Sequence, residues 1–183
     1  MRYLVFFLEE ESMRNTIAEL LHKLGCNDWN LKIIPFEGKS DLERQLLFKM
    51  RNWNIPDTYF VIVRDKDSGD CTLIKQRLLT ICAQSGKSSY KVRIVCHDLE
   101  NWFLGDLKAV ECAYGNRISE HQSKAKYRLP DDIANAFQEL QRLTGNRYQK
   151  LSGSREISKH MDLDNNLSHS FNVFIRTLKE ILV

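Results

Sequence analysis

The chain has 183 residues, of which 43% are hydrophobic and 28% charged, and its formal net charge is +3. This composition is typical of a globular protein and excludes disordered, collagen-like and low-complexity classes. The apolar run at residues 3–8 is too short to cross a bilayer, and three glutamates follow it directly. We therefore expect neither a membrane span nor a signal peptide in this region.

The five cysteines are widely separated in the sequence, and no two of them form a CxxC pair. An odd number of separated cysteines disfavours both a disulfide scaffold and a structural zinc site. We therefore expect free thiols and a cytoplasmic location.

The first hundred residues alternate between strand patterns and amphipathic helix patterns. The run RYLVFFL is continuously apolar after its first residue, as a buried strand is, and Gly25 ends the helical pattern that follows it. Pro35 indicates that the second strand ends or lies at a sheet edge. The series has strands at 2–8, 31–36, 58–63 and 91–96 and helices at 12–24, 40–53 and 71–84. This alternation predicts an α/β protein with a parallel sheet flanked by helices.

The remainder of the chain has mostly helical patterns. The clearest helices are expected at 98–113, 131–143 and 170–182, and the stretch 144–154 has the composition of a loop. We expect residues 1–116 to form the α/β core and residues 117–183 to form a helical extension packed on it, within one structural domain. Because residues 117–159 carry an excess of basic side chains, the extension is a candidate surface for an anionic partner.

Acidic residues follow three of the four predicted strands. They are Glu9, Glu10 and Glu11 after the first strand, Asp65 and Asp67 after the third, and Asp98 and Glu100 after the fourth. Ligands of parallel α/β sheets bind outside the carboxyl ends of the strands, so these acids are predicted to share one edge. The alternative is that each acid only solvates its loop.

Several carboxylates at one point repel each other unless a cation lies between them. Hard oxygen ligands suit Mg²⁺ or Mn²⁺, and such an ion commonly binds phosphate oxygens as well. The sequence therefore predicts a divalent metal site, with Glu11, Asp98 and Asp106 as possible additional acids.

Two groups of basic residues are candidates for binding phosphate or nucleic acid. The first is a strip around Tyr127, composed of Lys124, Lys126 and Arg128, which is equally consistent with a solvated loop. The second is Lys150 and Arg155, which are predicted to lie in a glycine-bounded loop before a short helix.

Longer strings of residues carry a family resemblance. They are RDKDSGDC at 64–71 and LENWFLGDL at 99–107, with shorter matches at 130–131, 148–150, 153–157 and 168–171. On these strings and on Glu9, the chain resembles the DUF4276 family, which is usually described as Toprim-like. Toprim domains occur in topoisomerases, primases and nucleases of the OLD class.

The resemblance implies a Toprim-like, Rossmann-like fold and a role for each acid. Glu9 would be the general acid or base and a metal ligand, Asp65 and Asp67 would hold the divalent ion, and Glu100 would add a further acid. Members of this family often occur beside an ATPase in defence-type gene pairs, so an ATPase partner and an anti-phage role are implied. Toprim-like families often have Gly after the glutamate and a second Glu four positions on, where this chain has Glu10 and Met13.

The leading hypothesis is a Mg²⁺- or Mn²⁺-dependent nuclease that hydrolyses DNA or RNA phosphodiesters. An alternative is a non-catalytic regulatory subunit of an ATPase with a degenerate pocket, which the altered turn at Glu10 favours. A third hypothesis is phosphate-ester chemistry on a nucleotide, because a long polymer normally needs a larger basic surface.

Overall fold

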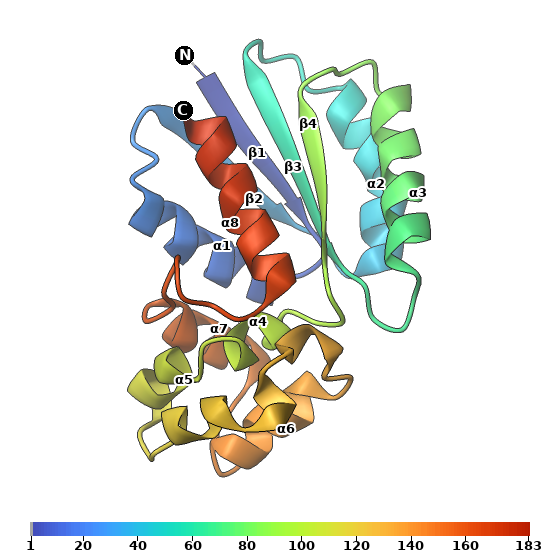
Figure 1. The fold of residues 1–183 in the computed structure, drawn as a ribbon. Helices are drawn as coiled ribbons and strands as arrows, with labels where there is room; N and C mark the ends of the chain where they lie inside the picture. The colour runs from blue at the N-terminus through green and yellow to red at the C-terminus, as the bar shows by residue number, and fades with distance from the viewer. Residues whose placement is uncertain (1) are drawn as a thin grey trace.

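A parallel sheet forms the centre of the computed structural model, which describes residues 2–183 (Figure 1). Within these residues, the strands lie in the order β2-β1-β3-β4, and every neighbouring pair is parallel. Their bounds are Arg2–Leu8 for β1, Trp29–Pro35 for β2, Thr58–Asp65 for β3 and Tyr90–Val95 for β4. The parallel α/β fold is confirmed, and β2, which ends at Pro35, is an edge strand as expected.

Helices cover both faces of the sheet (Figure 1). One face packs against α1 and α8, and the other packs against α2 and α3. The bounds of these helices are Glu11–Leu24 for α1, Lys39–Arg51 for α2, Cys71–Gln84 for α3 and His169–Leu182 for α8. The last helix therefore returns from the end of the chain to complete the layer that α1 begins.

Alternate residues of each strand enter the two hydrophobic cores. In β1, Phe6 and Leu8 belong to the core under α1 and α8, and Phe7 belongs to the core under α2 and α3. Phe7 stacks on Phe60 of β3 with ring centroids 5.9 Å apart. Full burial of a side chain of this size stabilises a protein by roughly 1.5–3 kcal/mol. The run at the start of the chain is continuously apolar because helices pack on both faces of β1.

A group of short helices lies beyond the carboxyl ends of the strands (Figure 1). It consists of α4 (Glu100–Leu104), α5 (Leu107–Tyr114), α6 (Ala136–Leu143) and α7 (Lys150–Ser158), with 3₁₀ turns at Ser119–Ser123, Ala125–Tyr127 and Pro130–Asp132. Helix α7 packs on α1, where Asn15 Nδ2 donates to the Leu151 carbonyl at 3.1 Å and Ser158 Oγ donates to Thr16 Oγ1 at 3.0 Å.

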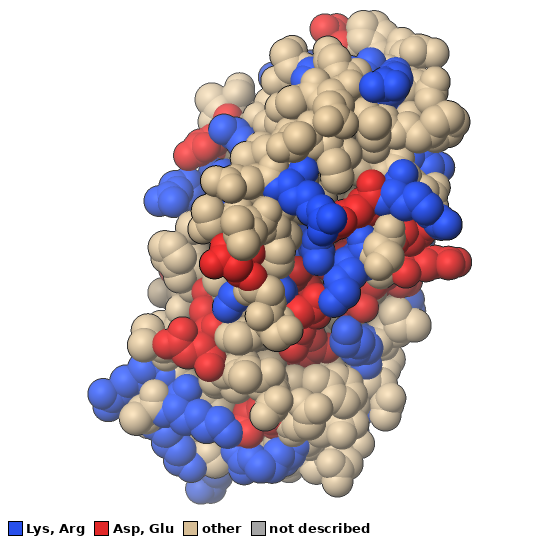
Figure 2. Space-filling model, turned by 90° about the vertical axis from the view of Figure 1, so that its right-hand side faces the viewer, with Lys and Arg blue, Asp and Glu red and all other residues tan. Residues whose placement is uncertain are grey.

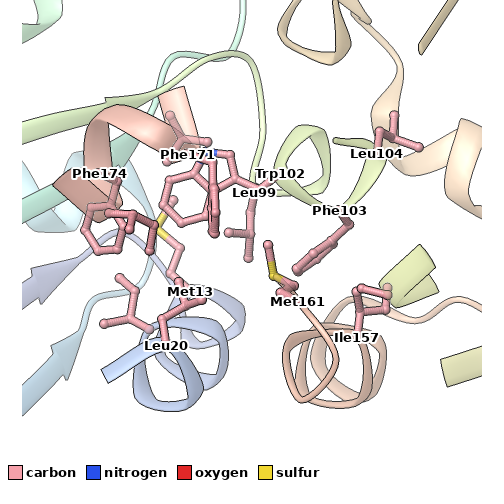
Figure 3. Packing of buried hydrophobic residues seen from close by; sticks show 14 of the residues in the cluster. Met13, Leu20, Leu99, Trp102, Phe103, Leu104, Ile157, Met161, Phe171 and Phe174 are labelled. Carbon is pink, nitrogen blue, oxygen red and sulfur yellow. The ribbon is translucent and has the colours of Figure 1, made fainter. Parts of the chain in front are cut away.

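The larger core continues from the sheet into this helical group. Figure 3 shows Met13 and Leu20 of α1 facing Met161 and the Trp102–Phe171 pair. Trp102 also donates its Nε1–H to Ser170 Oγ at 2.9 Å. Trp102 is therefore a core residue that holds α4 against α8. The proposed division at residue 116 stays a prediction, because one cluster of buried residues extends across both segments.

Three expected elements differ in the structure. The helix predicted at 98–113 is interrupted after Leu104, because Gly105 packs against the segment before α8 and Asp106 caps a new helix through its Oδ1, which accepts from the Ala109 amide at 3.0 Å. The helix predicted at 131–143 starts only at Ala136, after a 3₁₀ turn. The predicted loop at 144–154 ends in helix α7, where Gly153 is buried against the Tyr148 ring and does not mark a loop.

No helix among residues 2–183 has both the length and the apolar character needed to cross a membrane. The structure describes all five cysteines, and each is a free thiol, as their spacing predicts.

Candidate functional site at the carboxyl edge of the sheet

The strand register brings the acids of different strands to one edge. Leu8 of β1 pairs with Val63 of β3, and Asp65 pairs with Val95 of β4, so the three strands end at similar levels. The chain leaves β1 for β2 on one side and has β3 on the other, which makes the gap between β1 and β3 a topological switch point. Parallel α/β sheets bind their ligands at such a point.

Glu9 follows β1 at this switch point. Its Oε2 accepts a hydrogen bond from the Asp65 amide at 3.1 Å, which holds the carboxylate against the end of β3. Burial, and then the negative charge of Asp67, raises the pKa of Glu9 to about 6. A carboxyl group with this pKa exchanges protons near neutral pH, as a general acid or base must.

Asp65, the last residue of β3, is a buried carboxylate with an unsatisfied oxygen. The residue is 4% exposed, and Oδ1 has no hydrogen-bond partner among the described residues. Burial, followed by repulsion from Glu9 and Glu100, raises the pKa of Asp65 well above its ordinary value. Because buried polar atoms are normally paired, this oxygen indicates a position for a cation or a proton.

Glu100 is the first residue of α4 and is completely buried. Its Oε1 accepts from the hydroxyl of Tyr148 at 2.9 Å, whereas Oε2 is without a partner in the part of the chain that the structure describes. Burial raises the pKa of Glu100 above its ordinary value despite the nearby positive charge of Lys150. The Tyr148 hydroxyl therefore fixes one oxygen and leaves the other available to a ligand.

Two lysines form ion pairs with the outer acids. Lys39 Nζ lies 3.0 Å from Asp67 Oδ2, and Lys150 Nζ donates to both oxygens of Glu10 at 3.1 and 3.2 Å. Burial lowers the pKa of Lys150, but the carboxylates of Glu100 and Glu10 outweigh it and raise the pKa. These ammonium groups offset part of the negative charge at the edge of the sheet.

A buried arginine connects the site to helix α2, which covers one face of the sheet. The Nη1 of Arg64 donates to Glu43 Oε1 of α2, and its Nε lies 3.8 Å from Glu9 Oε2. That Nε has no hydrogen-bond partner within residues 2–183. The guanidinium thus places a positive charge near the Glu9 carboxylate, at a distance too long for a hydrogen bond.

Of the three additional acids that were predicted, one lies at this edge and two have contacts elsewhere in the fold. Asp98 lies half-buried at the edge, and burial raises its pKa. Glu11 is exposed and pairs with Arg14 on α1. Asp106 is buried and structural, because its Oδ1 caps α5 and its Oδ2 accepts from the Asp162 amide at 2.8 Å.

Of the predicted basic residues, Lys150 joins the acids, whereas the others do not form one group with it. Lys126 binds Glu139 of α6 at 2.5 Å, and Lys124 contacts His121, so both belong to the helical group. Arg128 and Arg155 are exposed. Figure 2 shows acidic and basic side chains interleaved across the middle of the face it presents, rather than a continuous basic surface.

Three residues that matter at the site were not predicted for their observed roles. Tyr148 lies in a loop, as expected, but its burial and its bond to Glu100 were not predicted, and Lys39 and Arg64 had no predicted role. Lys39 begins α2 after the short loop that follows β2, so the rule that loops after parallel strands share one edge could have identified it. The position of Tyr148 depends on the packing of the helical group and has no local signal.

The donor set at this edge fits a hard divalent cation by its chemistry. Asp65 and Glu100 each present a buried carboxylate oxygen that has no partner among the residues described, and Glu9 lies beside Asp65. Carboxylate oxygens without thiol or imidazole partners suit Mg²⁺ or Mn²⁺. Within residues 2–183, no three acidic, histidine or cysteine side chains form a group that could hold a metal ion as they stand. Side-chain rotation, water or substrate oxygens would have to complete the coordination.

Fold and site together define a parallel α/β domain that gathers carboxylates at the switch point of its sheet. The family model described as "Domain of unknown function (DUF4276)" matches residues 8–179, and the chain belongs to this family. Among solved structures, the fold is similar to the C-terminal region of the Burkholderia pseudomallei OLD protein, with a TM-score of 0.62, 12% identity and 98% of each chain covered. No curated protein matches the chain.

Proposed function

We propose that this protein is a Toprim-like nuclease that uses Mg²⁺ or Mn²⁺ to hydrolyse phosphodiester bonds in DNA or RNA. The observation that carries the proposal is Asp65, whose buried Oδ1 has no partner among the described residues, whose amide binds Glu9, and whose charge is repelled by both Glu9 and Glu100. Such an arrangement costs stability unless a cation or a proton neutralises it. The likeness in fold to the C-terminal region of an OLD protein supports this class of function.

Each acid has a separate task in this proposal. Asp65, Asp67 and Glu100 would hold the cation together with Glu9. A bound divalent cation would supply a Lewis acid for the phosphate oxygens. Glu9, whose pKa is about 6 without a bound cation, would take a proton from the attacking water or return one to the leaving oxygen. Lys150, at the start of α7, would contact the substrate backbone once its pairing with Glu10 is exchanged.

The test is cleavage by the purified full-length chain. The wild type is expected to cut DNA or RNA oligonucleotides with Mg²⁺ or Mn²⁺ and to lose the activity with EDTA. Asp65→Asn keeps the shape of the side chain but removes its charge, and we expect at least a hundredfold loss of rate, on the scale of a lost electrostatic contact at the reacting centre. Asp164→Asn, at an exposed site paired with Lys179, is the matched control and should cut normally. Unchanged cleavage by Asp65→Asn would remove the assignment.

We further propose that the protein acts in the cytoplasm beside an ATPase, as the effector of an anti-phage defence system. This step depends on the family resemblance, since members often occur in such gene pairs. Cleavage that appears only after the partner ATPase is added would support a gated nuclease.

A regulatory, non-catalytic role is the second candidate, and the ion pairs of the outer acids favour it. Lysines neutralise both Glu10 and Asp67, and in the described part of the chain the acids do not form a ready-made metal group. A degenerate pocket would predict that the protein binds its ATPase equally well with or without Asp65. Pull-down of the ATPase by wild type and Asp65→Asn, combined with the cleavage assay, separates the two functions.

A further inference from the structure

Lys39 is placed where a helix disfavours a positive charge. It is the first residue of α2, and the preceding N-cap residue, Gly38, has no side chain to cap the helix. The amino terminus of a helix carries a partial positive charge, so a lysine there needs an anionic partner. In the structure that partner is Asp67, at 3.0 Å.

The backbone on both sides of this ion pair is attached to the strand ends. The Gly38 amide donates to the Glu9 carbonyl at 2.9 Å, and the Asp67 amide donates to the His97 carbonyl at 2.9 Å. Asp67 also has a left-handed backbone with φ of 51°. The fold therefore anchors the backbones that carry Lys39 and Asp67 beside the proposed catalytic acids.

The ion pair is exposed enough to exchange. The side chains of Lys39 and Asp67 are 52% and 36% exposed, and ion pairs this accessible contribute little to stability. A cation bound by the acids would compete for the charge of Asp67 and release the ammonium. A phosphate oxygen then offers Lys39 a charge-assisted hydrogen bond of the stronger kind.

The two lysines of the site approach it from different faces of the sheet. Helix α2, which carries Lys39, covers one face, while α7, which carries Lys150, packs on α1 over the other face. A polynucleotide strand that crosses the carboxyl edge would therefore pass a cation on each side of the acids.

We propose, on the basis of the nuclease function above, that Lys39 binds a backbone phosphate of the polynucleotide on the α2 side of the acids. It exchanges Asp67 for that phosphate when a divalent cation is bound. The phosphate is a neighbour of the reacting one, so Lys39 determines how the strand lies across the site.

The experiment measures the binding of fluorescein-labelled single-stranded DNA and RNA oligonucleotides by fluorescence anisotropy in the presence of Mn²⁺. The anisotropy is read before the oligonucleotides are cleaved. Lys39→Ala is expected to weaken binding about tenfold, since it loses one charge-assisted phosphate contact. The slope of log affinity against log salt should fall by about 0.7, the value for one phosphate of a single strand. The matched control is Lys49→Ala, an exposed lysine in the last turn of the same helix, which should leave both quantities unchanged.

Calorimetric titration with Mn²⁺ alone provides the readout that separates substrate binding from metal binding. Lys39→Ala should bind Mn²⁺ as tightly as the wild type or more tightly, because a competing cation is removed from Asp67. Loss of Mn²⁺ binding would overturn the proposal, and so would equal oligonucleotide affinity and salt slope in Lys39→Ala and Lys49→Ala. Failure of the wild type to bind either oligonucleotide would also overturn it. Binding that depends on Lys39 without any cleavage would support the phosphate contact while rejecting the nuclease.

Discussion

At the scale of single residues, the candidate site contains buried negative charge that lowers the stability of the folded protein. Asp65 is buried, repelled by Glu9 and Glu100, and has one oxygen without a partner among the described residues. Functional sites commonly hold such unfavourable groups at the expense of stability. This mutual repulsion is relieved by a bound cation or by a proton, and the proposed nuclease function requires the cation.

Asp65→Asn is therefore predicted to stabilise the metal-free protein while removing its response to metal. Because the pKa of Asp65 is raised in the folded state, its contribution to stability is complete below the unfolded pKa and is lost as the pH rises through the folded pKa. The asparagine mimics the protonated acid at every pH. We expect an increase of about 1–3 kcal/mol in the free energy of unfolding near neutral pH, measured by urea denaturation in EDTA. A less stable Asp65→Asn protein would show that the buried charge is satisfied in a way the structure does not reveal.

At the scale of elements, Glu139 ties α6 to the 3₁₀ turn around Tyr127. The residue is 7% exposed and accepts hydrogen bonds from Arg142, Lys126 and Tyr127. Burial acts to raise the pKa of Glu139, but these donors outweigh it and lower the pKa to about 2. Burial and the bond to Glu139 raise the pKa of Tyr127 to about 12. The helical group is therefore held together by this hydrogen-bond network as well as by hydrophobic packing.

The network predicts a specific acid sensitivity. Since the pKa of Glu139 falls from 4.5 to about 2 on folding, its stabilisation is present above pH 4.5 and is lost as the pH falls towards 2. The loss should amount to up to about 3 kcal/mol, from 1.36 kcal/mol for each pKa unit. Glu139→Gln should be less stable at pH 7 and should lose less stability than the wild type between pH 4.5 and 2. Parallel stability curves for the two proteins over this interval would contradict the assignment.

The junction between α4 and α5 depends on Gly105. A Cβ at this position would overlap the Asn166 side chain and lie 2.8 Å from the amide of Ser168, the residue that caps α8. Gly105→Ala should therefore lower the free energy of unfolding by about 2–3 kcal/mol, as overpacking does. Gly145→Ala, where a Cβ meets no atom within 4 Å but φ is 63°, should cost only about 1–2 kcal/mol. Thermal denaturation of both variants tests whether Gly105→Ala lowers the stability more than Gly145→Ala does.

At the scale of the whole molecule, the sequence predicted the sheet and the edge at which the acids meet. Continuous apolar strands and the position of Glu9, Asp65 and Glu100 after them are local signals, and the parallel topology converts them into proximity. The partners of these acids were not predictable in the same way, because Tyr148 and Lys150 reach the site only through the packing of α7 on α1. The break at Gly105 was missed because its cause lies sixty residues further along the chain.

The most direct test of the proposed metal site is the position of Mn²⁺ in a crystal of the wild-type protein soaked with this ion. We expect an anomalous density peak at the carboxyl edge of the sheet, bounded by Glu9, Asp65 and Glu100, which disappears in Asp65→Asn crystals. An empty edge at saturating Mn²⁺, or a peak that persists in Asp65→Asn crystals, would contradict the claim that these carboxylates form a metal site.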